Sequence, residues 1–292
     1  MLTDSRQSNL VDEFSAPWGH FELHGYLKVW LGLCHTIPGW PCLRRLALWF
    51  RSPLKTKLSG PVDVIVWGLK LRLWSKGNLS EQRLLLTPQF LDPKERLWLS
   101  NELKNGGVFL DVGTNIGVYS MWAASISKDV HVESFEPDPE LCKRLISNLK
   151  RNKIENVHLN EFALGGECGE INLARGVNNL GENRLTVDAL GAVPNLVVRV
   201  CTLSEIIHQK DIRQIDAMKI DVEGHEVAVL KPFFNQAPEC SWPRSIICEL
   251  DRRVESPTET EIGTLLLRNG YQLAQRTRMN GIFIKRAISR DV

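Results

Sequence analysis

A regular alternation of apolar runs and segments with helical spacing, beginning near residue 107, is the feature that most constrains the fold of this chain. Runs typical of buried strands occupy 107–112, 130–136, 215–222 and 244–250. Segments with the spacing of amphipathic helices occupy 117–126, 138–152 and 225–234. Because strands joined through helices usually run parallel, this order predicts an α/β fold whose mainly parallel sheet is covered on both faces.

The alternation has one interruption. "NVHLNEFAL" (156–164) is expected to be the third strand of the sheet. Between 165 and 202 the helical spacing is lost, and "GEINLARG" and "NLVVRVCTL" predict added strands around the polar loop "GVNNLGENRLT" (176–186). A helix at 259–270 and strands at 271–275 and 281–286 are expected to complete the domain.

The first 60 residues differ from the rest of the chain. Four of the nine tryptophans lie within the first 49 residues, and 26–57 mixes Trp, Leu and Phe with seven Lys, Arg and His residues. Pro38 and Pro41 limit this stretch to two short helices. We therefore divide the chain into a Trp-rich, partly basic helical extension, 1–60, and an α/β domain, 61–292. The extension is expected to pack on its own domain, on a second subunit, or on an anionic membrane surface.

Residues 62–95 carry two local signals. "VDVIVWGLKLRLW" (62–74) predicts a hairpin that turns near Gly68. Asp92, Pro93 and Glu95 have the spacing of a helix start, with Asp92 as the N-cap and Glu95 three residues after it.

Charge and cysteine content exclude few partners. Thirty-six basic and 34 acidic residues give a net charge of +2, which is too weak to argue for nucleic acid. Seven cysteines without a CxxC pair predict reduced thiols and no zinc site. The N-terminus lacks the pattern of a signal peptide, and no apolar stretch approaches the ~20 residues of a membrane span. We expect a cytoplasmic protein, with membrane association through 26–57 as the alternative.

"FLDVGTNIGVYS" (109–120) indicates what the domain binds. In an open parallel sheet, ligands lie beyond the carboxyl ends of the strands. Asp111 lies at the end of the first strand, and Gly113 and Gly117 allow a tight turn and a close approach of the backbone to a ligand. Glu136 ends the second strand, where a carboxylate can accept hydrogen bonds from ribose hydroxyls. This combination predicts a nucleoside site.

The spacing of the glycines indicates which nucleoside. A dinucleotide site has the pattern G-x-G-x-x-G, whereas this chain has G-x-x-x-G with Asp111 two residues before it. A carboxylate at this turn repels a pyrophosphate but suits an ammonium group, so ribose plus an amino acid predicts S-adenosylmethionine. The alternatives are a nicotinamide dinucleotide, or an acid and two glycines that serve only as a turn.

Four motifs in order, "FLDVGTNIGVYS", "SFEPDP", "FAL" and "MKIDVEGHEVAVL", resemble the FkbM family of S-adenosylmethionine-dependent methyltransferases, from about residue 62 to about 286. The resemblance implies the Rossmann-like class I methyltransferase fold, with an antiparallel last strand for which "GIFIKR" is the candidate. It implies that Glu136 holds the ribose and that Ala163 lies beside the adenine. The family usually has alanine where Thr114 stands. The methionine-side loop would comprise Asp111, Gly113, Asn115 and Gly117.

The charged end of "AMKIDVEGHE" is the candidate catalytic element. Strand alternation places Lys219, Asp221 and Glu223 on one side, where they form either a structural ion pair or part of the site. Methylation of a hydroxyl requires a base near the methyl donor, and Asp221 or Glu223 is favoured over His225 because the strand fixes both acids. Lys219 is expected to orient or neutralise an acid. Glu249, at the end of a later strand, is a further candidate.

The acceptor is expected to be a hydroxyl on a sugar, glycan or other small molecule. Enzymes that methylate amino groups of nucleic acids often carry an Asn/Asp-Pro-Pro-aromatic tetrapeptide at this strand end, and here the sequence is "DVEG". No metal site is apparent from the sequence. The alternative function is membrane or partner binding through 26–57, with the α/β domain as a scaffold. The loop at 176–186 is expected to shape the acceptor pocket.

Overall fold

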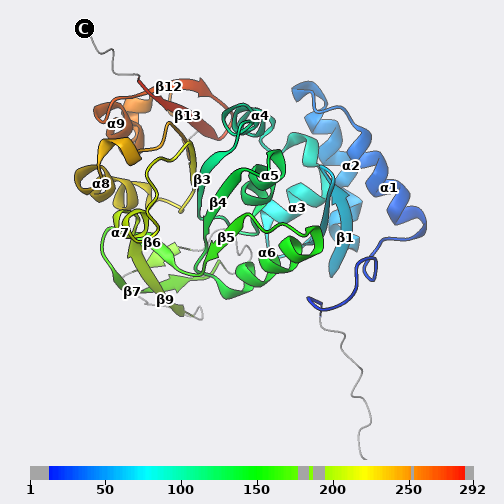
Figure 1. The fold of residues 1–292 in the computed structure, drawn as a ribbon. Coiled ribbons are helices and arrows are strands. Elements are labelled where there is room, and N and C mark those ends of the chain that lie inside the picture. Colours follow the sequence, from blue (N-terminus) through cyan, green and yellow to red (C-terminus); the bar gives the residue numbers. More distant parts are fainter. Residues whose placement is uncertain (1–12, 177–183, 187–194, 251–252, 287–292) are drawn as a thin grey trace, which may run out of the picture.

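The computed structural model describes residues 13–176, 184–186, 195–250 and 253–286. Its centre is a sheet in the order β12-β13-β11-β10-β3-β4-β5 (Figure 1). Five strands pair in parallel, and β13 runs antiparallel to both of its neighbours. This confirms the predicted α/β class and "GIFIKR" as the antiparallel strand. The strands are β3 (Gly107–Val112), β4 (Val130–Phe135), β5 (Val157–Asn160), β10 (Ala217–Ile220), β11 (Ser245–Glu249), β12 (Tyr271–Arg276) and β13 (Asn280–Lys285).

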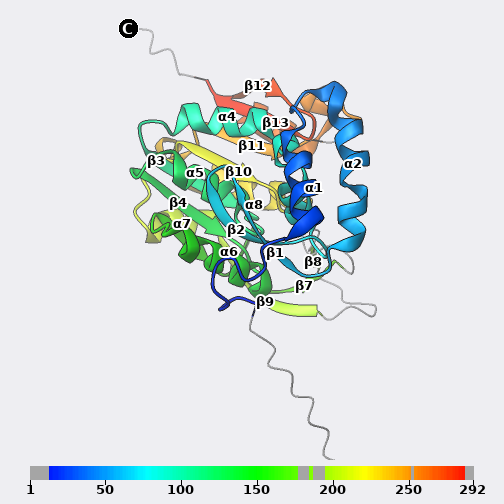
Figure 2. The same ribbon diagram turned by 90° about the vertical axis from the view of Figure 1, so that its right-hand side faces the viewer.

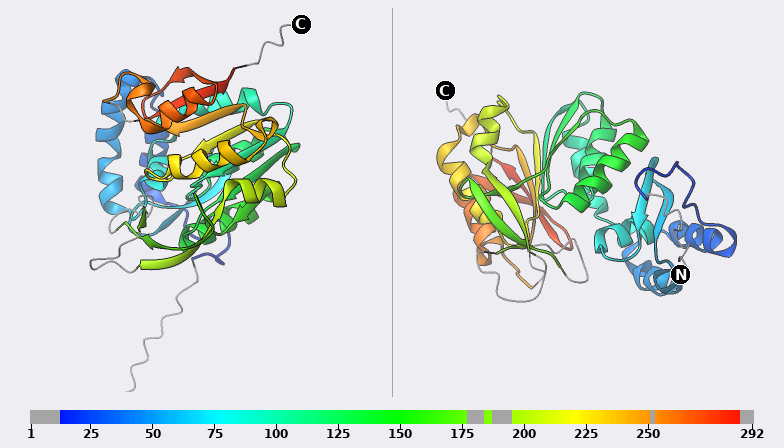
Figure 3. Two further views of the ribbon diagram at one scale, coloured as in Figure 1. Left: turned by 90° about the vertical axis from the view of Figure 1, so that its left-hand side faces the viewer. Right: turned by 90° about the horizontal axis from the view of Figure 1, so that it is seen from below.

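Helices cover the two faces of this sheet (Figure 3). On one face, buried side chains of α4 and α5 pack on Phe109, Val132 and Ile247. On the other face, α7, α8 and α9 pack on Leu110, Met218 and their neighbours. Because consecutive strand residues point to opposite faces, Phe109 and Leu110 enter different clusters. The helices are α4 (Pro93–Glu102), α5 (Val118–Ile126), α6 (Pro139–Asn152), α7 (Leu203–Gln209), α8 (Glu226–Gln236) and α9 (Glu261–Arg268).

A second sheet, in the order β6-β9-β7-β8, forms from the interruption in the alternation. Its strands are β6 (Ala163–Gly165), β7 (Gly169–Ala174), β8 (Arg184–Thr186) and β9 (Asn195–Thr202). The added strands were therefore predicted correctly. The single third strand over 156–164 was wrong, because β5 ends at Asn160 and β6 pairs with β9 instead of continuing the central sheet. Most of the polar loop, 177–183, lies outside the described residues.

The N-terminal elements pack on the α/β domain (Figure 2). They are α1 (Gly25–Thr36), α2 (Arg44–Lys57), the hairpin of β1 (Pro61–Val66) and β2 (Leu69–Trp74), and α3 (Leu79–Leu86). Leu31 and Leu54 share one hydrophobic cluster with Val62 of the hairpin and with Met121 and Leu145 of α5 and α6. The predicted hairpin and the pair of short helices are confirmed, and the extension packs on its own domain. The division at residue 60 remains a prediction.

A buried arginine ties the start of the chain to the hairpin. The Arg72 guanidinium, 1% exposed, forms an ion pair with Asp63 at 2.7 Å. It also donates to the backbone carbonyls of Ala16 and Pro17 at 3.0 and 2.9 Å. A buried charge is tolerated only with partners of this kind, so the segment before α1 contributes to the stability of the hairpin. Within the described ranges, no helix combines the length and hydropathy needed to cross a membrane.

Candidate active site

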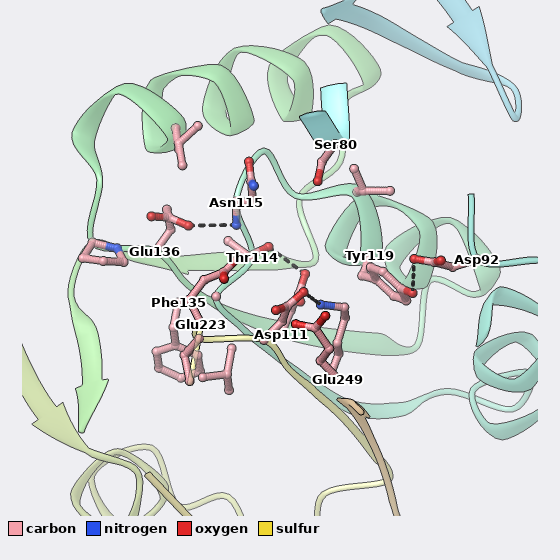
Figure 4. Close-up of a pocket in the computed structure, with 18 of the residues that line it drawn as sticks. Ser80, Asp92, Asp111, Thr114, Asn115, Tyr119, Phe135, Glu136, Glu223 and Glu249 are labelled. Atoms are coloured by element: carbon pink, nitrogen blue, oxygen red, sulfur yellow. Dashed lines mark hydrogen bonds and ion pairs between the residues drawn. The ribbon is translucent and has the colours of Figure 1, made fainter. Parts of the chain in front are cut away.

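A cavity of about 500 Å³ lies where the central strands β3, β4, β10 and β11 end. Six carboxyl groups line it, those of Asp92, Asp111, Glu136, Asp221, Glu223 and Glu249, and most are labelled in Figure 4. Two cationic side chains, Arg83 and Lys219, also line it. A pocket with this excess of acids attracts a cationic ligand.

Two glycines of the loop between β3 and α5 leave little room for a side chain. Gly113 has φ +76°, and a Cβ atom there would lie 2.0 Å from the Asp221 carbonyl oxygen. Gly117 has φ +78°, and its Cβ would lie 2.1 Å from Leu145 Cδ1. The contact at Gly113 is with backbone, which cannot move aside, so this position requires glycine. At Gly117 the positive φ and the buried Leu145 side chain both disfavour a Cβ. Gly113 and Asn115 line the cavity, whereas Gly117 supports the loop from the α6 side.

Asp111 is 1% exposed and is held by hydroxyl groups. Its Oδ2 accepts hydrogen bonds from Thr114 Oγ1 at 2.6 Å and Ser120 Oγ at 2.5 Å. Burial raises the pKa of Asp111, and the Lys219 ammonium partly opposes this effect. Thr114, where the family usually has alanine, therefore adds a donor to this carboxylate. The predicted interaction of Asp111 with an ammonium group remains a prediction.

Glu136 follows β4 and presents its carboxylate to the cavity (Figure 4). Its Oε2 accepts from the backbone N–H of Asn115 at 2.8 Å, and its Oε1 from that of Asp138 at 3.0 Å. Burial raises the pKa of Glu136 to about 7, although both hydrogen bonds oppose the shift. Each carboxylate oxygen can accept a second hydrogen bond, which leaves capacity for ribose hydroxyls. Ala163, predicted to lie beside the adenine, also lines the cavity, but it belongs to β6.

The predicted catalytic residues separate into two groups. Lys219, Asp221 and Glu223 line the cavity, as does Glu249. Strand alternation accounts only for Lys219, because β10 ends at Ile220 and the two acids follow the strand. Glu223 lies on a turn, with φ +52°. His225 is the residue that precedes α8 and is not among the residues that line the cavity.

Lys219 and Asp221 form an ion pair, with Nζ 2.8 Å from Oδ2. Burial alone would lower the pKa of Lys219, but the carboxylates of Asp221 and Asp111 outweigh it and raise the pKa. Lys219 is therefore an ammonium that positions acids. It also lies 4.9 Å from the centroid of the Tyr119 ring.

Asp92 occupies the predicted N-cap position of α4, which starts at Pro93, but its side chain forms no hydrogen bond that caps the helix. Its Oδ2 instead accepts from the Tyr119 hydroxyl at 2.9 Å, and both residues line the cavity. Glu95 accepts from Thr277 and Asn280 and does not close a capping box. Burial, followed by the Glu95 charge, raises the pKa of Asp92.

Backbone strain is concentrated at this cavity. Six non-glycine residues in the described ranges have positive φ, and three of them, Asp92, Asn115 and Glu223, line the cavity. Such conformations cost about 1–3 kcal/mol each and occur often at functional sites. In the same ranges, no three His, Cys, Asp or Glu side chains have an arrangement that could hold a metal ion.

Comparison with known proteins assigns the family. Residues 111–273, which are 163 of the 292 residues, match the Methyltransferase FkbM domain. The chain is 25% identical to the hexuronic acid methyltransferase AglP of Haloferax volcanii over 56% of this chain and 64% of that protein. It is 28% identical to the 31-O-demethyl-FK506 methyltransferase FkbM of Streptomyces tacrolimicus over 57% of this chain and 73% of that protein. The chain therefore spans less than two thirds of the first of these relatives.

Solved structures overlap with the chain in part. The SAM-dependent methyltransferase of Agrobacterium tumefaciens matches 77% of this chain and 70% of its own, at 10% identity and a TM-score of 0.44. The precorrin-6y C5,15-methyltransferase of Geobacter metallireducens matches 66% of this chain and 88% of its own, at 14% identity and a TM-score of 0.41. On the family match, which spans the strand-end loops of the cavity, the chain belongs to the FkbM methyltransferase family.

Proposed function

We propose that this protein transfers a methyl group from S-adenosylmethionine to a hydroxyl on a sugar, glycan or other small molecule. The observation that carries the proposal is the joint placement of Asp111, Glu136 and the Gly113 turn around one acid-rich cavity. A protein that used this fold only as a scaffold would need neither buried carboxylate, and each costs free energy to bury.

The residues of the cavity fit the cofactor. S-adenosylmethionine carries a net positive charge near neutral pH, which suits a cavity lined by six carboxyl groups and two cations. Glu136 would accept hydrogen bonds from the ribose hydroxyls, and Asp111 would face the ammonium group directly or through water. When bound, the cofactor supplies a methyl group that is already activated by the sulfonium. The protein's own tasks are therefore to position the acceptor, exclude water and remove a proton.

The acids at the end of β10 would remove the proton from the acceptor hydroxyl. We rank Asp221 and Glu223 first, since both line the cavity and His225 does not. Lys219 would fix Asp221 through their 2.8 Å ion pair and would not itself act as a base, because an ammonium has no lone pair. Asp92, which accepts from Tyr119, is a further carboxylate within the same cavity.

Methyl transfer to a panel of alcohols tests the proposal. The panel holds neutral sugars, uronic acids, polyketide alcohols and, for comparison, simple amines, and the methyl group of the donor is radiolabelled. We expect label in at least one alcohol, and loss of that signal in Glu136→Ala. Binding of the cofactor without transfer to any hydroxyl, but with transfer to amines, would contradict the hydroxyl assignment.

We also propose that α1 and α2 contact an anionic membrane surface. Residues 25–57 contain six Lys and Arg and no Asp or Glu. Trp40 and Trp49 are 65% and 71% exposed, and the other exposed large apolar side chains of this segment are Tyr26, Val29, Leu33 and Leu46. Exposed apolar side chains among basic ones are typical of interfacial helices. We call the six exposed apolar residues, together with the six Lys and Arg residues of the same segment, the apolar–basic surface.

Liposome flotation tests this second proposal. The intact protein should float with vesicles that contain phosphatidylserine and not with neutral vesicles, and Trp49→Ala should reduce flotation. Leu97→Ala is the matched control, because Leu97 is 63% exposed on α4, away from the apolar–basic surface. Absence of flotation would reject the membrane. A dimer in light scattering that Trp49→Ala dissociates would assign the surface to a second copy of the chain instead.

A further inference from the structure

Arg83 differs from the other charged groups of the cavity. It is exposed on α3, lines the cavity and, within the described ranges, forms no ion pair. Lys219, the second cation of the cavity, is paired with Asp221. Of these two cations, Arg83 is therefore the one whose N–H groups can donate hydrogen bonds to a ligand.

A second arginine lies close to Arg83. Arg51 of α2 is partly buried and donates to Thr87 Oγ1 at 3.2 Å, and it too has no carboxylate partner in the described part of the chain. Thr87, which Arg51 contacts, donates its backbone N–H to the Arg83 carbonyl at 2.9 Å, so Arg51 lies against the end of the helix that carries Arg83. In agreement with this, burial and then repulsion from Arg83 lower the pKa of Arg51. The Asp92 carboxyl interacts electrostatically with Arg83 but forms no ion pair with it. A guanidinium group without a carboxylate in direct contact keeps its donors for an anion.

Neutral donors adjoin this pair. Ser80 precedes Arg83 by three residues on α3, so both lie on the same helix face, and both line the cavity. Figure 4 shows Ser80 beside Asn115 of the loop between β3 and α5. Asn78 Nδ2 donates to Asn115 Oδ1 at 2.7 Å and fixes the start of α3 against that loop.

The loop itself has no backbone donor to spare. The N–H groups of Gly113 and Thr114 both donate to the Phe135 carbonyl, and that of Asn115 donates to Glu136. The N–H groups of Ile116 and Gly117 donate within the loop. An anionic group bound beside residues 113–117 would therefore depend on side-chain donors.

We propose that Arg83, supported by Arg51 and Ser80, is the receptor for a carboxylate group of a ligand in this cavity. The carboxylate belongs either to the methionine part of the cofactor or to an acidic acceptor such as a uronic acid. A guanidinium can bind either group through two parallel hydrogen bonds. The cofactor arm of this inference rests on the proposed function.

Calorimetric titration of the full chain with two cofactor forms tests the first source. S-adenosylmethionine carries the carboxylate, and decarboxylated S-adenosylmethionine lacks it. If the receptor holds the cofactor, Arg83→Gln should weaken binding of S-adenosylmethionine by about 10- to 100-fold, the range for loss of a hydrogen bond to a charged group. It should leave the affinity for the decarboxylated form unchanged, and Arg83→Lys should retain part of the difference.

Titration with acceptor analogues tests the second source. Protein saturated with S-adenosylhomocysteine is titrated with glucuronate and with glucose. If the receptor holds an acidic acceptor, the wild type should prefer glucuronate to glucose, and Arg83→Gln should remove that preference. The wild type and Arg83→Gln should then bind S-adenosylmethionine with equal affinity. Arg213→Gln is the matched control, because the Arg213 side chain is 85% exposed and pairs with Asp211.

The outcomes separate the two proposals. Equal affinities of wild type and Arg83→Gln for every ligand would overturn the carboxylate receptor. A wild-type protein that binds neither cofactor form would overturn the proposed function, and the glucuronate titration, repeated without S-adenosylhomocysteine, would then decide the receptor. Arg83 is exposed, so its replacement should not unfold the protein, and thermal unfolding of each variant checks this. Arg51→Gln is the second variant and should reproduce the loss in weaker form.

Discussion

The ionisation of Glu136 should be visible in cofactor binding. Its pKa is about 7, and acceptance of hydroxyl hydrogen bonds beside a cationic ligand favours the ionised form. Binding therefore lowers this pKa. Below about pH 7 the free Glu136 is protonated, so binding must be accompanied by release of its proton. Affinity for S-adenosylmethionine should rise with pH up to about 7 and then level off. Glu136→Gln should bind more weakly at pH 8 and lose this pH dependence in calorimetry. An unchanged profile in the variant would remove Glu136 from the site.

Gly113 should tolerate no side chain. Gly113→Ala combines an unfavourable φ with a Cβ that would lie 2.0 Å from the Asp221 carbonyl oxygen. Gly270→Ala is the matched control, because Gly270 has φ +82° but no atom within 4 Å of its Cβ position. The control should cost about 1–2 kcal/mol of unfolding free energy, as expected for the φ alone. Gly113→Ala should cost more in urea denaturation and should abolish cofactor binding. Equal costs for the two variants would show that the close approach is not required.

The proton step should depend on an acid at the end of β10. Asp221→Asn or Glu223→Gln should slow single-turnover methyl transfer by about 10²–10⁴-fold and leave cofactor affinity nearly unchanged. His225→Ala serves as the control, since His225 does not line the cavity. If all three variants transfer at the wild-type rate, Glu249 or Asp92 becomes the candidate base.

At the scale of elements, the sequence predicted what local patterns encode. The placement of Asp111 near the end of β3 and of Glu136 directly after β4 follows from periodicity, because a buried strand with an acid near its end is visible in one segment. The break between β5 and β6 was missed, since Asn160 and Glu161 carry no strong turn signal and the change of partner to β9 is a tertiary event. The N-cap position of Asp92 was predicted, but its hydrogen bond with Tyr119 was not, because the two residues lie 27 positions apart in the sequence.

The same argument explains why Ser80 and Arg83 were missed. They belong to α3, which precedes the motifs of the family, and nothing in "NLSEQRLLL" indicates a cavity. Asn78 brings α3 to the loop between β3 and α5 through its contact with Asn115, across 37 residues of sequence. Packing between distant elements decides such a contact, and periodicity within one element does not report it.

The N-terminal helices should be needed for stability and not only for partner binding. Leu54 of α2 is 1% exposed within the cluster that α5 and α6 share, so Leu54→Ala should lower the unfolding free energy by about 2–5 kcal/mol. Leu46→Ala, at a position 49% exposed on the same helix, should change it by less than about 0.5 kcal/mol. Urea denaturation measures both. A small effect of Leu54→Ala would support an independent domain that begins near residue 60.

At the scale of the whole molecule, charge is divided between two regions. The cavity is rich in carboxyl groups, whereas residues 25–57 carry six basic residues and no acid. The small net charge of +2 conceals this division. The acidic cavity suits a cationic cofactor, and the apolar–basic surface suits an anionic membrane. Arg51 belongs to α2 and lies near Arg83, so the N-terminal helices connect the two regions.

Calorimetric titration of S-adenosylmethionine into the full chain and into Glu136→Ala tests the central claim most directly. The account predicts saturable binding with one site per chain in the wild type. It also predicts that the variant, with its fold intact by circular dichroism, binds more weakly by about 1–3 kcal/mol, the cost of leaving the ribose hydroxyls without their charged acceptor. Equal affinity of the two proteins, or no binding by the wild type, would contradict it.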